Sequence, residues 1–132
     1  MNVPGIAEGF TDQGSLTHDS LIAGEFPRIA RVVTITGGAT LPAGSVLGRV
    51  AASGAYALSD AGENDGSEEP DAILAHDTDA SLGDVQAHVY LAGEFNADAL
   101  TIGPGHSPAS VSIAFRERSI FLRNLSVNNT QP

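Results

Sequence analysis

The fold of this chain is most constrained by two short runs rich in β-branched residues, residues 32–36 and 45–50. Such residues suit pleated strands, because branching at Cβ packs well on a sheet and restricts side-chain rotation in a helix. Between the runs stand three glycines and Pro42, which has no N–H to give to a strand ladder. The stretch therefore predicts two strands joined by a turn. A third run, residues 55–58, follows Ser53-Gly54, a pair typical of hairpin turns, so we expect one β meander.

The rest of the chain predicts further strands and a short helix. Residues 72–75 are all apolar and predict a short buried strand, and residues 119–122 predict a last one. Residues 85–91 alternate between apolar and polar, which predicts a half-buried strand that is broken by residues 93–96. The side chains expected to face the core are Val85, Ala87, Val89 and Leu91, and those expected on the other face are Gln86, His88 and Tyr90.

Helix signals are confined to two places near the C-terminal end of the sequence. Ser107-Pro108 combines a favoured N-cap with a proline at the first helical position, where its missing N–H costs nothing. The residues expected on the apolar face of that helix are Val111, Ile113, Ala114 and Phe115. Asn96 is a candidate cap for a short helical turn that runs to Leu100.

Length and composition predict one domain with polar ends. The 132 residues suffice for a single core. Residues 1–24 contain four glycines and only scattered apolar side chains, so we expect a flexible N-terminal arm. We expect the domain at residues 25–123 and a polar tail at residues 124–132. Two interpretations of the arm stay open: it has no role, or it orders on a partner by adding a strand to a sheet edge.

The charge and the missing residue types exclude several kinds of chemistry. The net charge is −10, and all six basic residues are Arg. An acidic surface repels phosphate backbones, so we expect no direct nucleic-acid partner. Without Cys there is no thiol catalysis and no disulfide, and without Lys there is no Schiff base. No apolar run approaches the roughly 20 residues of a membrane span, so we expect no membrane partner.

We find no catalytic, cofactor-binding or metal-binding motif in the sequence. The histidines, which are His18, His76, His88 and His106, share no metal-ligand spacing. No serine lies in a Gly-x-Ser-x-Gly elbow, and no glycine-rich segment has the spacing of a phosphate loop. We therefore predict a protein that is not an enzyme and holds no cofactor.

Two acidic segments raise the alternative of a calcium site. Residues 59–71 hold many carboxylates, but neither Asp60 nor Asp65 begins the ligand order of an EF-hand. The series that begins at Asp77 comes closer, although Leu82 stands at the glycine position and His88 at the closing glutamate. We favour solvated acidic loops and keep a calcium-dependent binding module as an alternative.

Several motifs occur in an order that resembles a known family. They include Leu-Pro-Ala-Gly-Ser-Val-Leu-Gly at residues 41–48 and Val-Tyr-Leu-Ala-Gly-Glu-Phe-Asn at residues 89–96. The other motifs lie at residues 21–27, 33–35, 65–67, 70–74, 77–81 and 116–122. Together they are similar to the lambda-type bacteriophage head decoration protein over about residues 21–123.

The resemblance implies a mostly β, α+β fold of the β-clip type with one or two short helices. It implies a homotrimer on the outer surface of the expanded phage head, at three-fold and local three-fold positions. There it would bind the major capsid (coat) protein and stabilise the head against internal DNA pressure, after a period in the host cytoplasm during assembly. The arm would order on the coat, with Phe10, Leu16, Leu21 and Ile22 as capsid-binding anchors.

A carbohydrate-binding β-clip domain is the remaining alternative, since part of the meander is shared with such domains. It would need aromatic platforms or a polar cleft. Two Tyr and no Trp argue against it.

Overall fold

The longest strand, β7 (Val85–Asn96), lies at the centre of the strand pairing. The computed structural model describes residues 21–22 and 27–123. β7 pairs antiparallel with β1 (Ile29–Ile35) along the whole of β1. On its other edge it pairs antiparallel with β5 (Ala72–Leu74). Tyr90 of β7 thus lies between Ala30 in β1 and Ile73 in β5. One strand therefore joins two parts of the sheet that are far apart in sequence.

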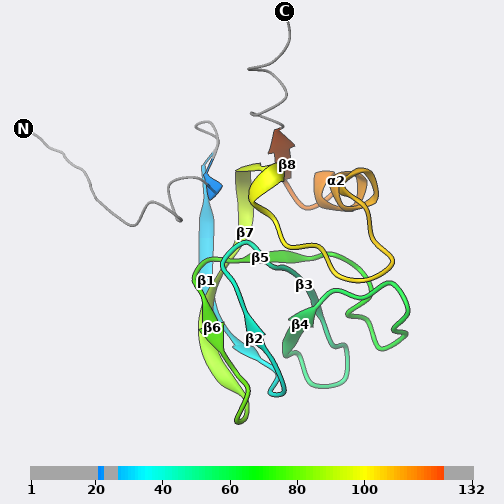
Figure 1. Cartoon of the computed structure of the whole chain (residues 1–132). Helices are drawn as coiled ribbons and strands as arrows, with labels where there is room; N and C mark the ends of the chain where they lie inside the picture. Colours follow the sequence, from blue (N-terminus) through cyan, green and yellow to red (C-terminus); the bar gives the residue numbers. More distant parts are fainter. Residues whose placement is uncertain (1–20, 23–26, 124–132) are drawn as a thin grey trace, which may run out of the picture.

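The sheet closes on itself to form a small barrel. β3 (Val46–Arg49) pairs antiparallel with both β4 (Tyr56–Leu58) and β5. β4 meets β1 in parallel at Tyr56 and Ile35, so the order β1-β4-β3-β5-β7 returns to β1 (Figure 1). Closure of this kind removes most of the open sheet edge.

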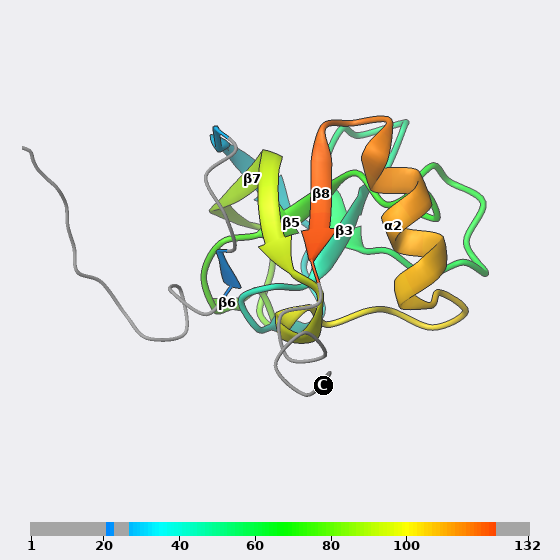
Figure 2. The same ribbon diagram turned by 90° about the horizontal axis from the view of Figure 1, so that it is seen from above.

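The remaining elements flank the barrel. β8 (Ile120–Arg123) extends the sheet by pairing in parallel with the last residues of β7, and α2 (Pro108–Arg116) lies alongside β8 (Figure 2). β2 (Thr40–Leu41) and β6 (Thr78–Asp79) form a separate two-stranded sheet. A single 3-10 turn, η1 (Ala97–Ala99), follows β7. No helix in the described part of the chain has the length and apolar character needed to cross a bilayer.

The core has two parts because β3, β5 and β7 are buried on both faces. One part lies toward α2 and contains Val46, Ile73 and Tyr90 from these strands. The other fills the barrel and contains their neighbours Leu47, Leu74 and Val89. Strands buried on both faces have continuous apolar sequences, which explains the unbroken apolar run that predicted β5.

The predicted fold class, mostly β in an α+β arrangement, is confirmed. So are the buried strand at β5, the last strand at β8 and the hairpin at Ser53-Gly54, where the Val50 N–H donates to the Ala55 carbonyl at 2.8 Å. The helix begins as predicted, and the hydroxyls of Ser107 and Ser110 cap each other's backbone N–H groups. Asn96 caps η1 by accepting from the Asp98 N–H at 3.1 Å.

The prediction of one continuous meander is wrong at its first connection. β1 does not pair with β3 within the described part of the chain, since its partners are β7 and β4. The segment between β1 and β3 is longer than a hairpin loop, and it contains β2, whose Thr40 and Leu41 pair with Asp79 and Thr78. The connection therefore crosses to another part of the molecule.

Three further expectations are corrected. Residues 93–96 do not break the strand predicted at residues 85–91, because β7 runs on to Asn96 and pairs with β8 from Gly93 to Asn96. Tyr90 is buried at 6% exposure, since the face of β7 opposite the barrel is covered by the α2 side of the core. Ile113 is 65% exposed. It lies about 200° around the helix from Val111, whereas Val111 and Phe115 share the buried side.

We expect Gly48→Ala to destabilise the fold by about 1–3 kcal/mol or more. Gly48 lies in β3 directly against the backbone of Ser67, so an added methyl group would overlap the Ser67 carbonyl. Urea unfolding measures the change. Gly62→Ala is the matched control, because its methyl group would meet only the Asp60 carboxylate at 3.3 Å. Equal stability of the two variants would contradict the close approach.

Candidate functional site

The distance between the Ser59 hydroxyl and the His106 ring is that of a catalytic nucleophile and its base. Ser59 Oγ is 3.1 Å from His106 Nε2, and Ser59 is fully buried. The serine hydroxyl, however, donates its proton to the Ser67 carbonyl at 2.8 Å. Nε2 also lies 3.0 Å from the Glu68 carbonyl, which can only accept, so Nε2 carries a hydrogen and cannot take one from the serine. The pair therefore attaches the acidic loop (residues 59–71) to the segment before α2.

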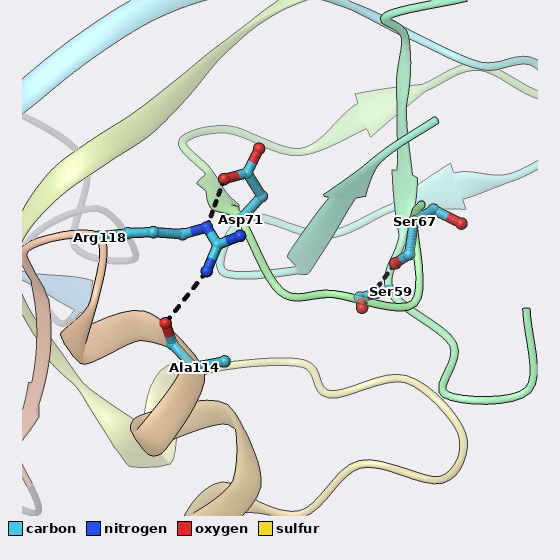
Figure 3. A network of polar contacts seen from close by, with 5 residues as sticks. All are labelled: Ser59, Ser67, Asp71, Ala114 and Arg118. Atoms are coloured by element: carbon cyan, nitrogen blue, oxygen red, sulfur yellow. Dashed lines mark hydrogen bonds and ion pairs between the residues drawn. The ribbon is translucent and has the colours of Figure 1, made fainter. Parts of the chain in front are cut away.

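The acidic loop is fixed at its other end by an ion pair. Arg118 Nε lies 2.7 Å from Asp71 Oδ1, and Arg118 also donates from Nη1 to the Ala114 carbonyl at 3.3 Å (Figure 3). The arginine thus satisfies a carbonyl at the C-terminal end of α2 while it holds the residue that precedes β5. Burial, with Asp71 nearby, raises the pKa of the Tyr56 phenol. The ion pair and the hydrogen bond of Arg118 therefore hold the acidic loop in place against α2.

The carboxylates of both acidic segments cap turns. Asp65 accepts from the Ser67 N–H at 3.0 Å and from its hydroxyl at 2.6 Å. Asp79 accepts from Ser81 in the same way, at 3.0 and 2.6 Å. Such hydrogen bonds lower the pKa of Asp65 and of Asp79. The turns therefore account for these acids without a bound cation. No three His, Asp or Glu residues of the described ranges lie close enough together to hold a metal ion.

The aromatic residues do not supply a sugar-binding platform. Tyr56 and Tyr90 are 8% and 6% exposed, and Phe95 and Phe115 are fully buried. Phe121 is partly buried. No Phe or Tyr side chain of the described residues is exposed, which argues against the carbohydrate-binding alternative.

One groove on the described surface is lined by both carboxylates and apolar side chains. It has a volume of about 530 Å³ and lies between the end of β1 and the acidic loop. We call it the acidic groove and define it by the apolar side chains of Leu41, Val50 and Leu58 and the carboxylates of Asp60, Glu63 and Asp65.

Large apolar side chains are exposed at three other places. Ile29 and Val32 in β1 are 53% and 50% exposed, and Leu82, in the loop between β6 and β7, is fully exposed. The third place is α2, where Ile113 is 65% exposed. Residues 28–32 are all exposed and include Arg28 and Arg31. We call residues 28–32 the basic strand.

Two of the four residues expected to bind the capsid lie in the described part of the chain. Leu21 is 1% exposed in the core, and Ile22 packs against that core and forms a β-bridge with Phe95. Phe10 and Leu16 lie outside the described residues. Residues 21 and 22 therefore pack on the domain rather than standing apart from it. The exposed side chains on β1 and α2 were missed, although helical spacing already separates Ile113 from Val111 and Phe115.

These features define a small, mostly β protein built around a closed barrel. A family model described as bacteriophage lambda head decoration protein D matches residues 12–119, and the chain belongs to this family. The predicted resemblance is confirmed. Membership makes the chain a structural protein of the phage virion that associates with the capsid. A search of curated proteins finds no match.

We expect Ser59→Ala to lower the free energy of unfolding by about 1–3 kcal/mol, because the buried Ser67 carbonyl loses its donor. Urea unfolding measures the loss. Ser112→Ala is the matched control, since Ser112 is a partly buried helical serine and alanine favours a helix. A Ser59→Ala protein as stable as the control would contradict the role of this hydroxyl.

We expect Ser81→Ala to raise the pKa of Asp79 toward its ordinary value of 3.8, because two hydrogen bonds from the hydroxyl and backbone of Ser81 lower it. The depressed pKa stabilises the fold above the unfolded pKa, and this contribution is lost as the pH falls through the folded pKa. The variant therefore loses stability at neutral pH but not at strongly acidic pH. An NMR titration measures the shift, with Asp65 as internal control. An unchanged Asp79 pKa would show that the Ser81 N–H and the Thr40 hydroxyl lower it without the Ser81 hydroxyl.

Proposed function

We propose that this protein binds the outer surface of the expanded phage head as a homotrimer and cements neighbouring coat subunits against the pressure of packaged DNA. The observation that carries the proposal is the family match over residues 12–119. The proposed binding positions are the three-fold and local three-fold axes of the head. The protein would pass through the host cytoplasm during assembly and bind only once heads have expanded.

The chemistry of the described chain supports a mechanical rather than a catalytic role. The polar side chains of the buried Ser59 and the partly buried Arg118 hold loops together. The barrel is closed by strands that are distant in sequence, which favours a rigid body. A rigid oligomer suits a protein that holds coat subunits together, because few of its side chains and loops lose conformational freedom on binding.

We propose further that residues 1–20 contact the coat protein, with Phe10 and Leu16 as anchors. Leu21 and Ile22 would fix the base of this arm to the barrel, since they pack on the core. A trimer presents three arms at once, and linked contacts of this kind raise the overall affinity without any new interaction.

The test combines light scattering with cosedimentation on undecorated expanded heads. We expect a trimer that pellets with heads in proportion to their three-fold positions. A chain that lacks residues 1–20 is expected to stay folded, because the core keeps Leu21, and to bind heads at least about 100-fold more weakly. A chain that lacks residues 1–24 also loses Leu21 from the core, and is expected to be less stable by about 2–5 kcal/mol.

Two results would contradict these proposals. Full-length protein that stays in the supernatant when heads pellet would overturn the decoration role. Truncated protein that binds heads as tightly as the full chain would overturn the role of the arm and leave decoration standing.

A further inference from the structure

We propose that copies of this chain associate head to tail, with the basic strand of one copy seated against the acidic groove of the next. The inference rests on the proposed homotrimer and names the two surfaces that would form it. The occupant of the acidic groove is thus a second copy of the same chain.

The basic strand has the features of a contact surface. Ile29 and Val32 are about half exposed, and Arg28 and Arg31 are exposed beside them. β1 pairs with β7 along one edge, whereas on the other edge it pairs within the described residues only at Ile35, with Tyr56. Most of this second edge therefore has no strand partner in the described part of the chain. A strand edge with unpaired backbone groups is prone to pair with another chain.

The acidic groove has the complementary features. Its volume of about 530 Å³ is in the range of sites that enclose side chains, and Leu41, Val50 and Leu58 give it an apolar lining. The Asp60 carboxylate is held by the Gly62 N–H at 2.8 Å, and that of Asp65 by Ser67. These carboxylates are therefore fixed in position, which suits the recognition of a cation.

Charge complementarity supports the pairing of these two surfaces. Asp71 and Arg118 form the ion pair seen in the described residues, and the acids of the groove have no arginine partner there. Arg28 and Arg31 likewise have no carboxylate partner there. The two surfaces therefore carry opposite charges that a single copy leaves unpaired, and opposite charges across an interface favour association and fix its register.

The symmetry of such a contact agrees with a closed trimer. The basic strand and the acidic groove are different surfaces, so each copy uses one to bind the preceding copy and the other to bind the following one. Contacts of this heterologous type form a ring when the rotation between copies closes.

Charge reversal tests the contact. We expect Arg31→Glu to raise the concentration at which the trimer dissociates by at least about tenfold, and Glu63→Arg in the same chain to restore part of that loss. Dilution followed by light scattering measures both. The matched control is Arg116→Glu, because Arg116 is also exposed and lies near the exposed Ile113, outside the proposed contact. All three substituted positions are exposed, so the thermal unfolding of the dissociated chain is expected to be unchanged.

Crosslinking gives an independent test, since the chain has no Cys. A chain with both Val32→Cys and Ala39→Cys carries one thiol on the basic strand and one at the lining of the acidic groove. A short bis-maleimide is expected to link such chains into covalent trimers, whereas a mixture of the two single variants stops at pairs. Ile113→Cys with Ala39→Cys is the control and is expected to give no covalent trimer.

The outcomes separate this inference from the proposed function. Wild-type protein that is monomeric at every concentration would overturn the homotrimer and this contact together. A trimer that ignores Arg31→Glu, or that crosslinks through Ile113 instead of Val32, would overturn the contact and leave the decoration role intact. Loss of the trimer with Arg31→Glu and its return with Glu63→Arg would support the contact.

Discussion

The antiparallel pairing of β1 with β7 is the interaction on which the rest of this structure depends. It joins the first strand of the domain to its longest one and turns an open sheet into a barrel. Every strand between them in the barrel is then buried on at least one face, and β3, β5 and β7 are buried on both. The two parts of the core lie on opposite faces of these strands, so loss of the β1–β7 pairing would open the barrel and expose its interior.

Local signals in the sequence were sufficient for elements whose stability is local. The Ser107-Pro108 start of α2, the Ser53-Gly54 hairpin and the apolar run of β5 each reflect a few neighbouring residues, and each was predicted. The errors arose where distant residues decide the outcome. The residues around 36–45 do not show that Thr40 and Leu41 pair with β6. The residues around Gly93 do not show that β8 pairs with the last residues of β7. The alternation of apolar and polar residues in β7 indicates only one buried face, so Tyr90 was expected on the exposed face. In the structure the part of the core toward α2 covers that face as well.

The candidate site was less predictable than the fold. The motifs supported the family and hence the association with the capsid. They did not show which surface of the domain makes the contacts. The acidic segments illustrate the reason. In the sequence they resemble a cation site, whereas in the structure Asp65 and Asp79 cap their own turns. Whether a carboxylate faces a ligand, a turn or a neighbouring copy depends on loop geometry. The sequence does not contain that information in any short pattern.

The position of Phe95 gives the molecule a defined route for mechanical load. Ile22 forms a bridge with Phe95, and Leu122 pairs with the same residue in parallel. The two ends of the described chain are thus attached to one residue near the end of β7. Tension applied through the segment before Leu21 enters the fold at this strand, which is also the one that closes the barrel. A pull on the protein would be spread over the most extensively paired strand, whereas a pull on β2 or β6 would strain only a two-stranded sheet.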